Sequence, residues 1–228
     1  MISTRLLAFV LLLSTAFPAG AEETTRVQVS ADNVVHDEKS GKVTYTGNVV
    51  VIRGTMQIIS DMLVISRGEE TVAATITATG KPLQFSNSGD GQTLSGDADT
   101  AVYRVQEKQL ELRGTPIRFN SVDENGERLS GSASNADYDM QDARIRMSGS
   151  VRFTQSAKGD RKAVTGTSSK ADYDMNAKLL VLSGGAIVRQ DGNTVTNDRI
   201  VFNMKESLIL AGQKAGARER VETILELE

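Results

Sequence analysis

The carboxylates that recur at a fixed spacing are two pairs of aspartates, Asp137 with Asp139 and Asp172 with Asp174. Side chains two residues apart on a β-strand point to the same side, so each pair could hold a cation or act as an acid and a base. In a third, similar segment Val102 replaces the first aspartate, which no shared catalytic or metal site would survive. Aspartate is also common beside turns, where it accepts backbone hydrogen bonds. We therefore predict a structural role for both pairs.

The other residue types leave little room for catalysis. The chain has no cysteine, which excludes disulfides, thiolate ligands and cysteine nucleophiles. Its single histidine, His36, falls in a predicted turn and rules out the usual multi-histidine metal sites. The sequence holds no glycine-rich phosphate loop, serine–histidine–aspartate set or zinc-ligand spacing. We predict no catalytic residue, no metal and no cofactor. The alternative, an exported carbohydrate-active β-solenoid enzyme, would need outward acidic side chains clustered across neighbouring repeats.

The chain is organised around a segment that occurs three times, at residues 93–114, 128–149 and 163–184, with a spacing of 35 residues. Each copy begins with an apolar residue and a glycine, continues with an alanine and a tyrosine, and ends in an apolar-x-apolar-x-glycine run. A fixed period of this length predicts stacked supersecondary units that share a continuous core. The matched glycines and tyrosines are Gly96, Gly131, Gly166, Tyr103, Tyr138 and Tyr173.

Within each copy apolar residues alternate with polar ones. In the second copy Ile145 and Met147 enclose Arg146, a pattern that predicts a strand with aliphatic side chains inward and charged ones in water. Residues 139–142 and 174–177 lie between two such runs and are typical of hairpin turns. The glycine that ends each run suits a bulge or a bend between two sheets. Each copy is therefore predicted to form a few short antiparallel strands of an elongated all-β fold.

The first residues predict a secretory signal peptide. Arg5 supplies a positive charge, residues 6–17 form an apolar run, and small residues follow. The run is shorter than the roughly 20 residues that span a bilayer. We predict residues 1–21 to be a cleaved signal peptide and residues 22–212 to be one continuous domain. An uncleaved membrane anchor is the alternative.

The charge of the chain argues against nucleic-acid binding. The 228 residues include 26 basic and 29 acidic ones, a net charge of −3. A protein that binds nucleic acid electrostatically has a clustered basic surface, whereas here the basic residues are scattered along outward strand positions. A solvated outer face is the prediction.

Both ends of the chain are predicted to be open sheet edges. Residues 26–35 and 218–227 contain neither proline nor glycine, and an unprotected edge invites pairing with another chain. The apolar spacing of residues 213–228 is compatible with a helix as well as a strand; we predict a strand. Four acidic residues in this segment oppose pairing between two C-terminal edges, which favours head-to-tail association. The residues predicted at this interface are Val27, Val29, Val221, Thr223, Leu225 and Leu227.

The chain resembles the OstA-like family. The similarity begins with residues 29–35 (VSADNVV), 41–51 (GKVTYTGNVVV) and 54–64 (GTMQIISDMLV), and the family's run of alternating residues before Leu-x-Gly recurs in the later repeats. It covers essentially everything after the predicted signal. The resemblance implies a β-jellyroll of stacked V-shaped strands whose apolar interior shields lipid acyl chains. It also implies members that join end to end between the inner and outer membranes.

From this resemblance we expect a periplasmic, non-enzymatic carrier that binds lipopolysaccharide through its lipid A acyl chains. It would move the lipid from the inner to the outer membrane for outer-membrane assembly, with same-fold partners at both membranes. A bitopic inner-membrane component of the same pathway is an alternative. Aliphatic and methionine side chains with few rings leave room for flexible acyl chains. The residues expected to contact lipid are Val43, Tyr45, Val51, Ile58, Met62, Val64, Phe85, Leu112, Phe119, Met147 and Phe153.

Overall fold

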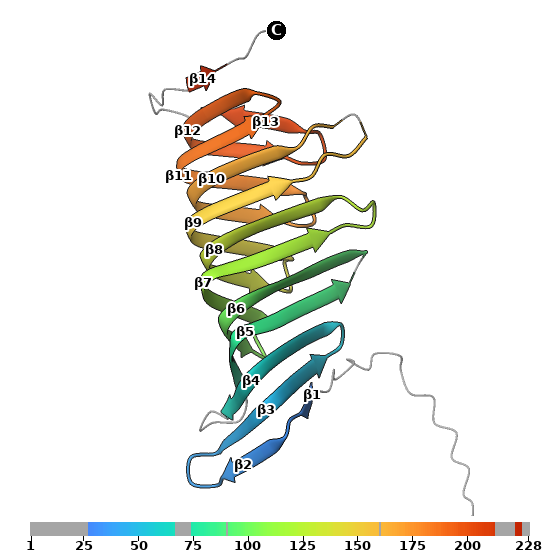
Figure 1. Ribbon diagram of the computed structural model, residues 1–228, viewed down its shortest axis with the longest axis vertical. Helices are drawn as coiled ribbons and strands as arrows, with labels where there is room; N and C mark the ends of the chain where they lie inside the picture. Colours follow the sequence, from blue (N-terminus) through green and yellow to red (C-terminus); the bar gives the residue numbers. More distant parts are fainter. Residues whose placement is uncertain (1–26, 67–73, 90, 160, 213–221, 225–228) are drawn as a thin grey trace, which may run out of the picture.

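The computed structural model describes residues 27–66, 74–89, 91–159, 161–212 and 222–224. These residues form one antiparallel sheet of 14 strands, stacked along the long axis of the molecule (Figure 1). The strands are β1 (Val27–Ser30), β2 (Asn33–Asp37), β3 (Lys42–Arg53), β4 (Met56–Ser66), β5 (Thr75–Gly89), β6 (Gln92–Arg104), β7 (Gln109–Val122), β8 (Arg128–Asp139), β9 (Arg144–Gln155), β10 (Val164–Asp174), β11 (Leu179–Gln190), β12 (Asn193–Asn203), β13 (Leu208–Ala211) and β14 (Glu222–Ile224).

The order of strands in the sheet follows their order in the chain. From β3 to β13 each strand pairs antiparallel with the next, so nearly all pairing is between neighbours in the sequence. At one end β1 and β2 both pair with β3, and at the other β13 and β14 both pair with β12. The all-β antiparallel architecture expected from the sequence is confirmed.

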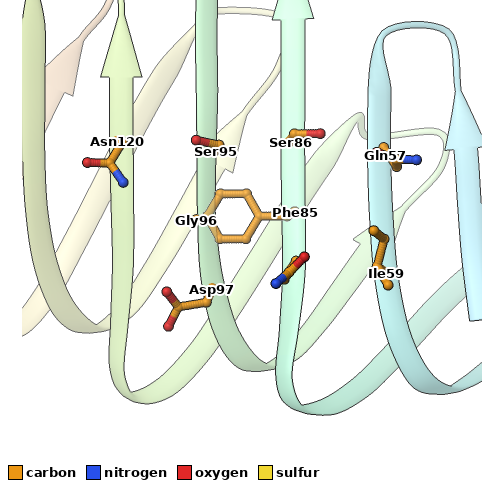
Figure 2. Close-up of a pocket in the computed structure, with 9 residues that line it drawn as sticks. Gln57, Ile59, Phe85, Ser86, Ser95, Gly96, Asp97 and Asn120 are labelled. Carbon is orange, nitrogen blue, oxygen red and sulfur yellow. The ribbon is translucent and has the colours of Figure 1, made fainter. Parts of the chain in front are cut away.

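Each long strand bends near its middle, and the bend changes which residues face inward. In β4 the buried residues Met56, Ile58 and Ser60 are followed by Leu63, a step of three residues instead of two. The pairing register shifts at the same place, between Ile59 and Met62. Register shifts occur in the middle of every pair of neighbouring long strands. Each strand curves there, and its second half runs back behind the first half, as the ribbons at the lower edge of Figure 2 show.

A glycine with a positive φ angle lies at the bend in three strands. In β9 Gly149 and Ser150 have φ angles of 80° and 51°, a left-handed conformation that glycine adopts at little cost. Gly47 in β3 and Gly184 in β11 hold the same place, with φ angles of 79° and 77°. The prediction that a glycine ending an apolar run marks a bend between two sheets is therefore correct for these strands.

The bends divide the sheet into two walls that face each other. The tyrosine wall carries all four tyrosines of the chain and consists of residues 33–37, 42–46, 62–66, 75–79, 100–104, 109–113, 135–139, 144–148, 170–174, 179–183, 199–203 and 208–211. The phenylalanine wall carries Phe85, Phe119 and Phe153 and consists of residues 27–30, 49–53, 56–60, 83–89, 92–98, 117–122, 128–133, 151–155, 164–168, 186–190, 193–197 and 222–224.

The repeated glycines of the phenylalanine wall lie beneath the phenylalanine rings. Gly131 pairs with Phe119 across the strands, and a Cβ atom on Gly131 would lie 2.5 Å from Cζ of that ring. Gly96 bears the same relation to Phe85, and Gly166 to Phe153. A ring that covers a cross-strand glycine fills the space its missing side chain leaves. The 35-residue period therefore corresponds to a packing unit in which one phenylalanine ring covers one glycine of the neighbouring strand.

Three expectations about the secondary structure were wrong. His36, expected in a turn, lies in β2 and pairs with Val43 of β3. The copies are not built from short strands, because β4 to β12 are 11 to 15 residues long and run through the bend. Conversely, residues 26–35 do not form one strand. The described part breaks between β1, which pairs in the phenylalanine wall, and β2, which pairs in the tyrosine wall. At the break the backbone N–H of Asp32 donates to the carbonyl of Gly47, 2.9 Å away.

Candidate functional site

The space between the two walls is the candidate site, because both walls turn their apolar side chains toward it. Large side chains such as Leu63, Leu182 and Phe202 have no measurable exposure. Phe153 of the phenylalanine wall stacks on Phe202 of the tyrosine wall with ring centroids 6.2 Å apart. In the C-terminal half the walls are therefore in direct contact. Such an interior offers burial of apolar groups.

The interior is open at the N-terminal end of the stack. Val34 of β2 is 60% exposed although it lies opposite Tyr45, whose side chain faces the interior. Val43 and Tyr45 are half-buried, whereas Tyr103, three strands further along, is 1% exposed. Apolar groups at this end are thus available to a ligand or to another chain.

The structure places most of the residues expected to contact lipid on the inward faces. Nine of them point into the space between the walls. Seven of these nine, all except Val43 and Tyr45, are at most 8% exposed. The inward set is Val43, Tyr45, Val51, Ile58, Phe85, Leu112, Phe119, Met147 and Phe153. Whether lipid touches them stays a prediction.

The inward placement of Met62 and Val64 was wrong. Met62 is 38% exposed, and Val64 shares its outward face because Leu63, between them, is fully buried. Strict alternation from Ile58 would put both inward, but the bend after Ser60 shifts the alternation by one residue. Sequence periodicity alone does not reveal this shift, because both faces of β4 are apolar here.

The residues predicted at a partner interface are only partly described. Val27 and Val29 lie in β1, half-buried against the core, and β1 is the first strand of the sheet as described. Thr223 lies in β14, which pairs with residues 194–196 of β12. Val221, Leu225 and Leu227 lie outside the described residues, as does the predicted signal peptide. The interface stays a prediction.

We call the opening between the two walls, on the side opposite the bends, the mouth. Polar contacts join the two walls across the mouth, and the sequence analysis did not predict them. The guanidinium of Arg53 lies 5.2 Å from the ring centroid of Tyr103. The side-chain amide of Asn87 donates to the hydroxyl of Tyr138 at 3.3 Å. Nζ of Lys178 donates to Oδ2 of Asp123 at 2.5 Å. These partners are 50 to 55 residues apart in the sequence, so no local pattern could have shown them.

The mouth encloses a small cavity and a buried phenol. The cavity has a volume of about 150 Å³ and is lined in part by Leu94, Tyr138, Met140 and Met175. Nearby, burial raises the pKa of Tyr173 to about 12, and the negative charge of Asp123 adds to the shift. The interior edge of the mouth therefore disfavours additional negative charge.

A second hollow lies on the outer face of the phenylalanine wall. It has a volume of about 290 Å³ over β4 to β7 and is lined mainly by polar side chains (Figure 2). The ring of Phe85 lies against Gly96 at its floor (Figure 2). At its edge Asp97 pairs with Arg118 at 3.2 Å. This polar surface is unsuited to burying acyl chains.

The repeated aspartates have structural partners. Asp172 accepts two hydrogen bonds from Arg144, at 2.6 and 2.8 Å, and this pairing raises the pKa of the guanidinium. Asp137 accepts from Arg113 at 3.1 Å. Asp139 accepts from the backbone of the turn that follows it, and Asp174 does the same. Within the described ranges no three metal-ligating side chains come together.

Comparison with known proteins identifies the class to which this bent, apolar-lined sheet belongs. The family model described as LptA/(LptD N-terminal domain) LPS transport protein matches residues 28–120 and 151–208. The match covers more than half of the chain, so the chain belongs to this family. The resemblance to the OstA-like family is thereby confirmed.

Among individual relatives, the lipopolysaccharide export system protein LptA of Escherichia coli (strain K12) is 31% identical over 119 residues. That alignment covers 50% of this chain and 64% of the relative. The protein of the same name from Haemophilus influenzae is 30% identical over 110 residues, covering 47% of this chain and 64% of the relative. The chain thus matches less than two thirds of the length of these relatives.

One solved structure aligns with most of the chain. LptH of Pseudomonas aeruginosa, titled the LptA homologous periplasmic component of the lipopolysaccharide transport device, covers 89% of this chain and 96% of its own. The identity is 16% and the TM-score 0.28, a similarity too low to carry a conclusion. Among the described residues there is no helix of the length and hydropathy needed to cross a bilayer.

Proposed function

We propose that this protein is a periplasmic carrier that binds lipopolysaccharide by enclosing its acyl chains between the two walls. The observation that carries the proposal is the continuous apolar interior of a sheet that is open at its N-terminal end. Val34, Val43 and Tyr45 leave apolar surface accessible there. Membership of a lipopolysaccharide transport family supports the choice of ligand.

Affinity should come from burial of hydrocarbon. Each methylene removed from water contributes about 0.8 kcal/mol, so a few carbons per acyl chain outweigh any single polar contact. The protein has a net charge of −3, and a phosphorylated glycolipid is also an anion. Long-range attraction between them is therefore absent, and binding should depend little on salt.

The test is binding of purified protein to lipopolysaccharide and to the same lipopolysaccharide stripped of its acyl chains. The acylated form should bind, with an affinity that changes little as the salt concentration rises. The stripped form should not bind. Equal binding of the two forms, or binding that salt abolishes, would rule out enclosure of acyl chains.

We further propose that copies associate head to tail and with same-fold partners at the inner and outer membranes, forming the bridge along which the lipid moves. Support comes from the edges: β1 at one end and β13 with β14 at the other each pair on one side only, as far as the described residues extend. Sedimentation should show a concentration-dependent series of species that deletion of residues 213–228 shortens. A protein that stays monomeric, and whose truncated form still supports transport, would contradict the bridge.

A further inference from the structure

Two ion pairs lie at the mouth of the C-terminal half of the interior. Lys178, in the turn after β10 of the tyrosine wall, donates to Asp123, in the loop after β7 of the phenylalanine wall, at 2.5 Å. Arg161, in the loop before β10, pairs with Glu127, which directly precedes the β8 segment of the phenylalanine wall. The other end of the Arg161 guanidinium donates to the carbonyl of Met204, which directly follows the β12 segment of the tyrosine wall, 3.3 Å away. We call Asp123, Glu127, Arg161 and Lys178 the clasp.

The clasp is held in place by its own loop and is largely shielded from water. Oδ1 of Asp123 accepts the backbone N–H groups of Asn125 and Glu127 at 2.9 and 2.8 Å, which leaves Oδ2 free for Lys178. The side chains of Asp123 and Lys178 are 11% and 22% exposed, and that of Glu127 is 16% exposed. Shielded, hydrogen-bonded ion pairs resist separation more than exposed ones, because a lone charge left behind is poorly solvated.

Toward the N-terminal end the contacts across the mouth become weaker. Next come two neutral hydrogen bonds, from Asn87 to Tyr138 at 3.3 Å and from Gln92 to the carbonyl of Met175 at 3.4 Å. Beyond these, Arg53 lies over the ring of Tyr103. Nε of that arginine and the hydroxyl of that tyrosine are buried without a hydrogen-bond partner, which disfavours the closed arrangement at this point.

The mouth is thus held weakly near the N-terminal end and strongly near the C-terminal end. Behind the clasp the interior is packed, with Phe153 stacked on Phe202. Lipid can occupy that half only if the walls separate and the clasp opens. At the N-terminal end, by contrast, apolar side chains are already accessible.

We propose that the clasp determines where acyl chains bind. The chains enter the part of the interior that strands β1 to β6 enclose, and they reach the C-terminal half only when Lys178 separates from Asp123. This inference rests on the proposed function, since it describes how the same interior receives its lipid. It assigns the four clasp residues a role in positioning the ligand, without direct contact to the acyl chains.

Locking the clasp tests the proposal. The chain has no cysteine, so Asp123→Cys and Lys178→Cys are the only thiols, and a short bis-methanethiosulfonate can bridge them across the mouth in place of the long lysine side chain. The reagent forms a disulfide with each thiol and is released by reduction. The matched control, Asn120→Cys with Ser130→Cys, is bridged in the same way between directly paired residues of β7 and β8 on the outer face of the phenylalanine wall, and it leaves all four clasp residues in place. A photo-reactive phenylalanine analogue at Phe85 or at Phe153 reports purified lipopolysaccharide in each half of the interior.

With the bridge in place, labelling at the Phe153 position should fall about tenfold or more relative to the same protein after reduction has released the bridge, while labelling at Phe85 is unchanged. A tenfold change corresponds to about 1.4 kcal/mol, well within what separation of a shielded ion pair requires. The control bridge between β7 and β8 should alter labelling at neither position. Equal labelling at Phe153 with the bridge in place and released would overturn the proposal.

A measurement without lipid separates failure of the clasp from failure of the proposed function. A cysteine at Met147, which is 4% exposed, should be alkylated by a maleimide about tenfold faster when Lys178→Met is added. Lys170→Met, the same change at an outward position of β10, is the control and should have no effect. If no position labels lipid, the proposed function fails and the alkylation rate alone decides on the clasp. An unchanged rate would refute it.

Discussion

Replacing Gly131 by alanine should destabilise the protein far more than the added methyl group suggests. A Cβ atom at this position would lie 2.4 Å from the carbonyl oxygen of Arg152 and 2.5 Å from Cζ of Phe119. The ring can rotate away only into the packed interior, and the carbonyl belongs to the ladder between β8 and β9. Both neighbours must therefore shift together.

Overpacking of a filled core costs about 1–3 kcal/mol, and the clash with backbone puts Gly131→Ala at the upper end, about 3 kcal/mol. Urea unfolding followed by circular dichroism measures this as a lower midpoint with an unchanged slope. Gly89→Ala is the matched control: it lies in β5, its φ is not positive, and its nearest neighbour is Oγ1 of Thr55 at 3.8 Å. The control should change stability by no more than about 0.5 kcal/mol. Equal stability of the two variants would refute the pairing of ring and glycine.

Three further outcomes follow from the described contacts. Phe153→Ala should lower the free energy of unfolding in urea by about 3–5 kcal/mol, because it leaves a cavity between the walls. The control Leu208→Ala, at a side chain that is 43% exposed, should lower it by about 0.5 kcal/mol. Similar losses of stability in the two variants would show that the walls are not packed together. The raised pKa of Tyr173, about 12, means that the unfolded chain loses its phenol proton first, near pH 10. Stability should therefore fall as the pH rises from about 10 to 12, and Tyr173→Phe should remove that part of the fall, as urea midpoints at several pH values will show. Asp172→Asn should cost less than about 1 kcal/mol, because its pair with Arg144 is partly exposed, and should leave lipopolysaccharide binding unchanged; loss of binding with intact stability would contradict a structural role.

Much of this fold could be predicted from local patterns. The hairpin turns predicted at residues 139–142 and 174–177 coincide with the connections from β8 to β9 and from β10 to β11, because aspartate and other polar residues there separate two runs of alternating apolar residues. The 35-residue period correctly indicated stacked units. Gly149 and Gly184 were correctly assigned to bends, because a left-handed residue inside an apolar run favours glycine.

The direction of side chains beyond a bend was harder to predict. Met62 and Val64 were assigned to the wrong face because the bend after Ser60 contains no glycine or proline. The partners of Gly96 and Gly131 were also hidden, because a strand pattern shows which residues alternate but not which ring covers a neighbouring strand. The contacts of the clasp depend on the way the two walls close on each other, which no local sequence signal records.

The central claim, that acyl chains lie between the walls, is tested most directly at two adjacent residues of the same type. Ile58 points inward and is 1% exposed, whereas Ile59 points outward and is 40% exposed. A small photo-reactive aliphatic residue at each position, irradiated in living cells, reports which face meets lipid. We predict a lipopolysaccharide adduct at Ile58 and none at Ile59. Equal adducts at both positions, or an adduct at Ile59 alone, would contradict enclosure of the lipid between the walls.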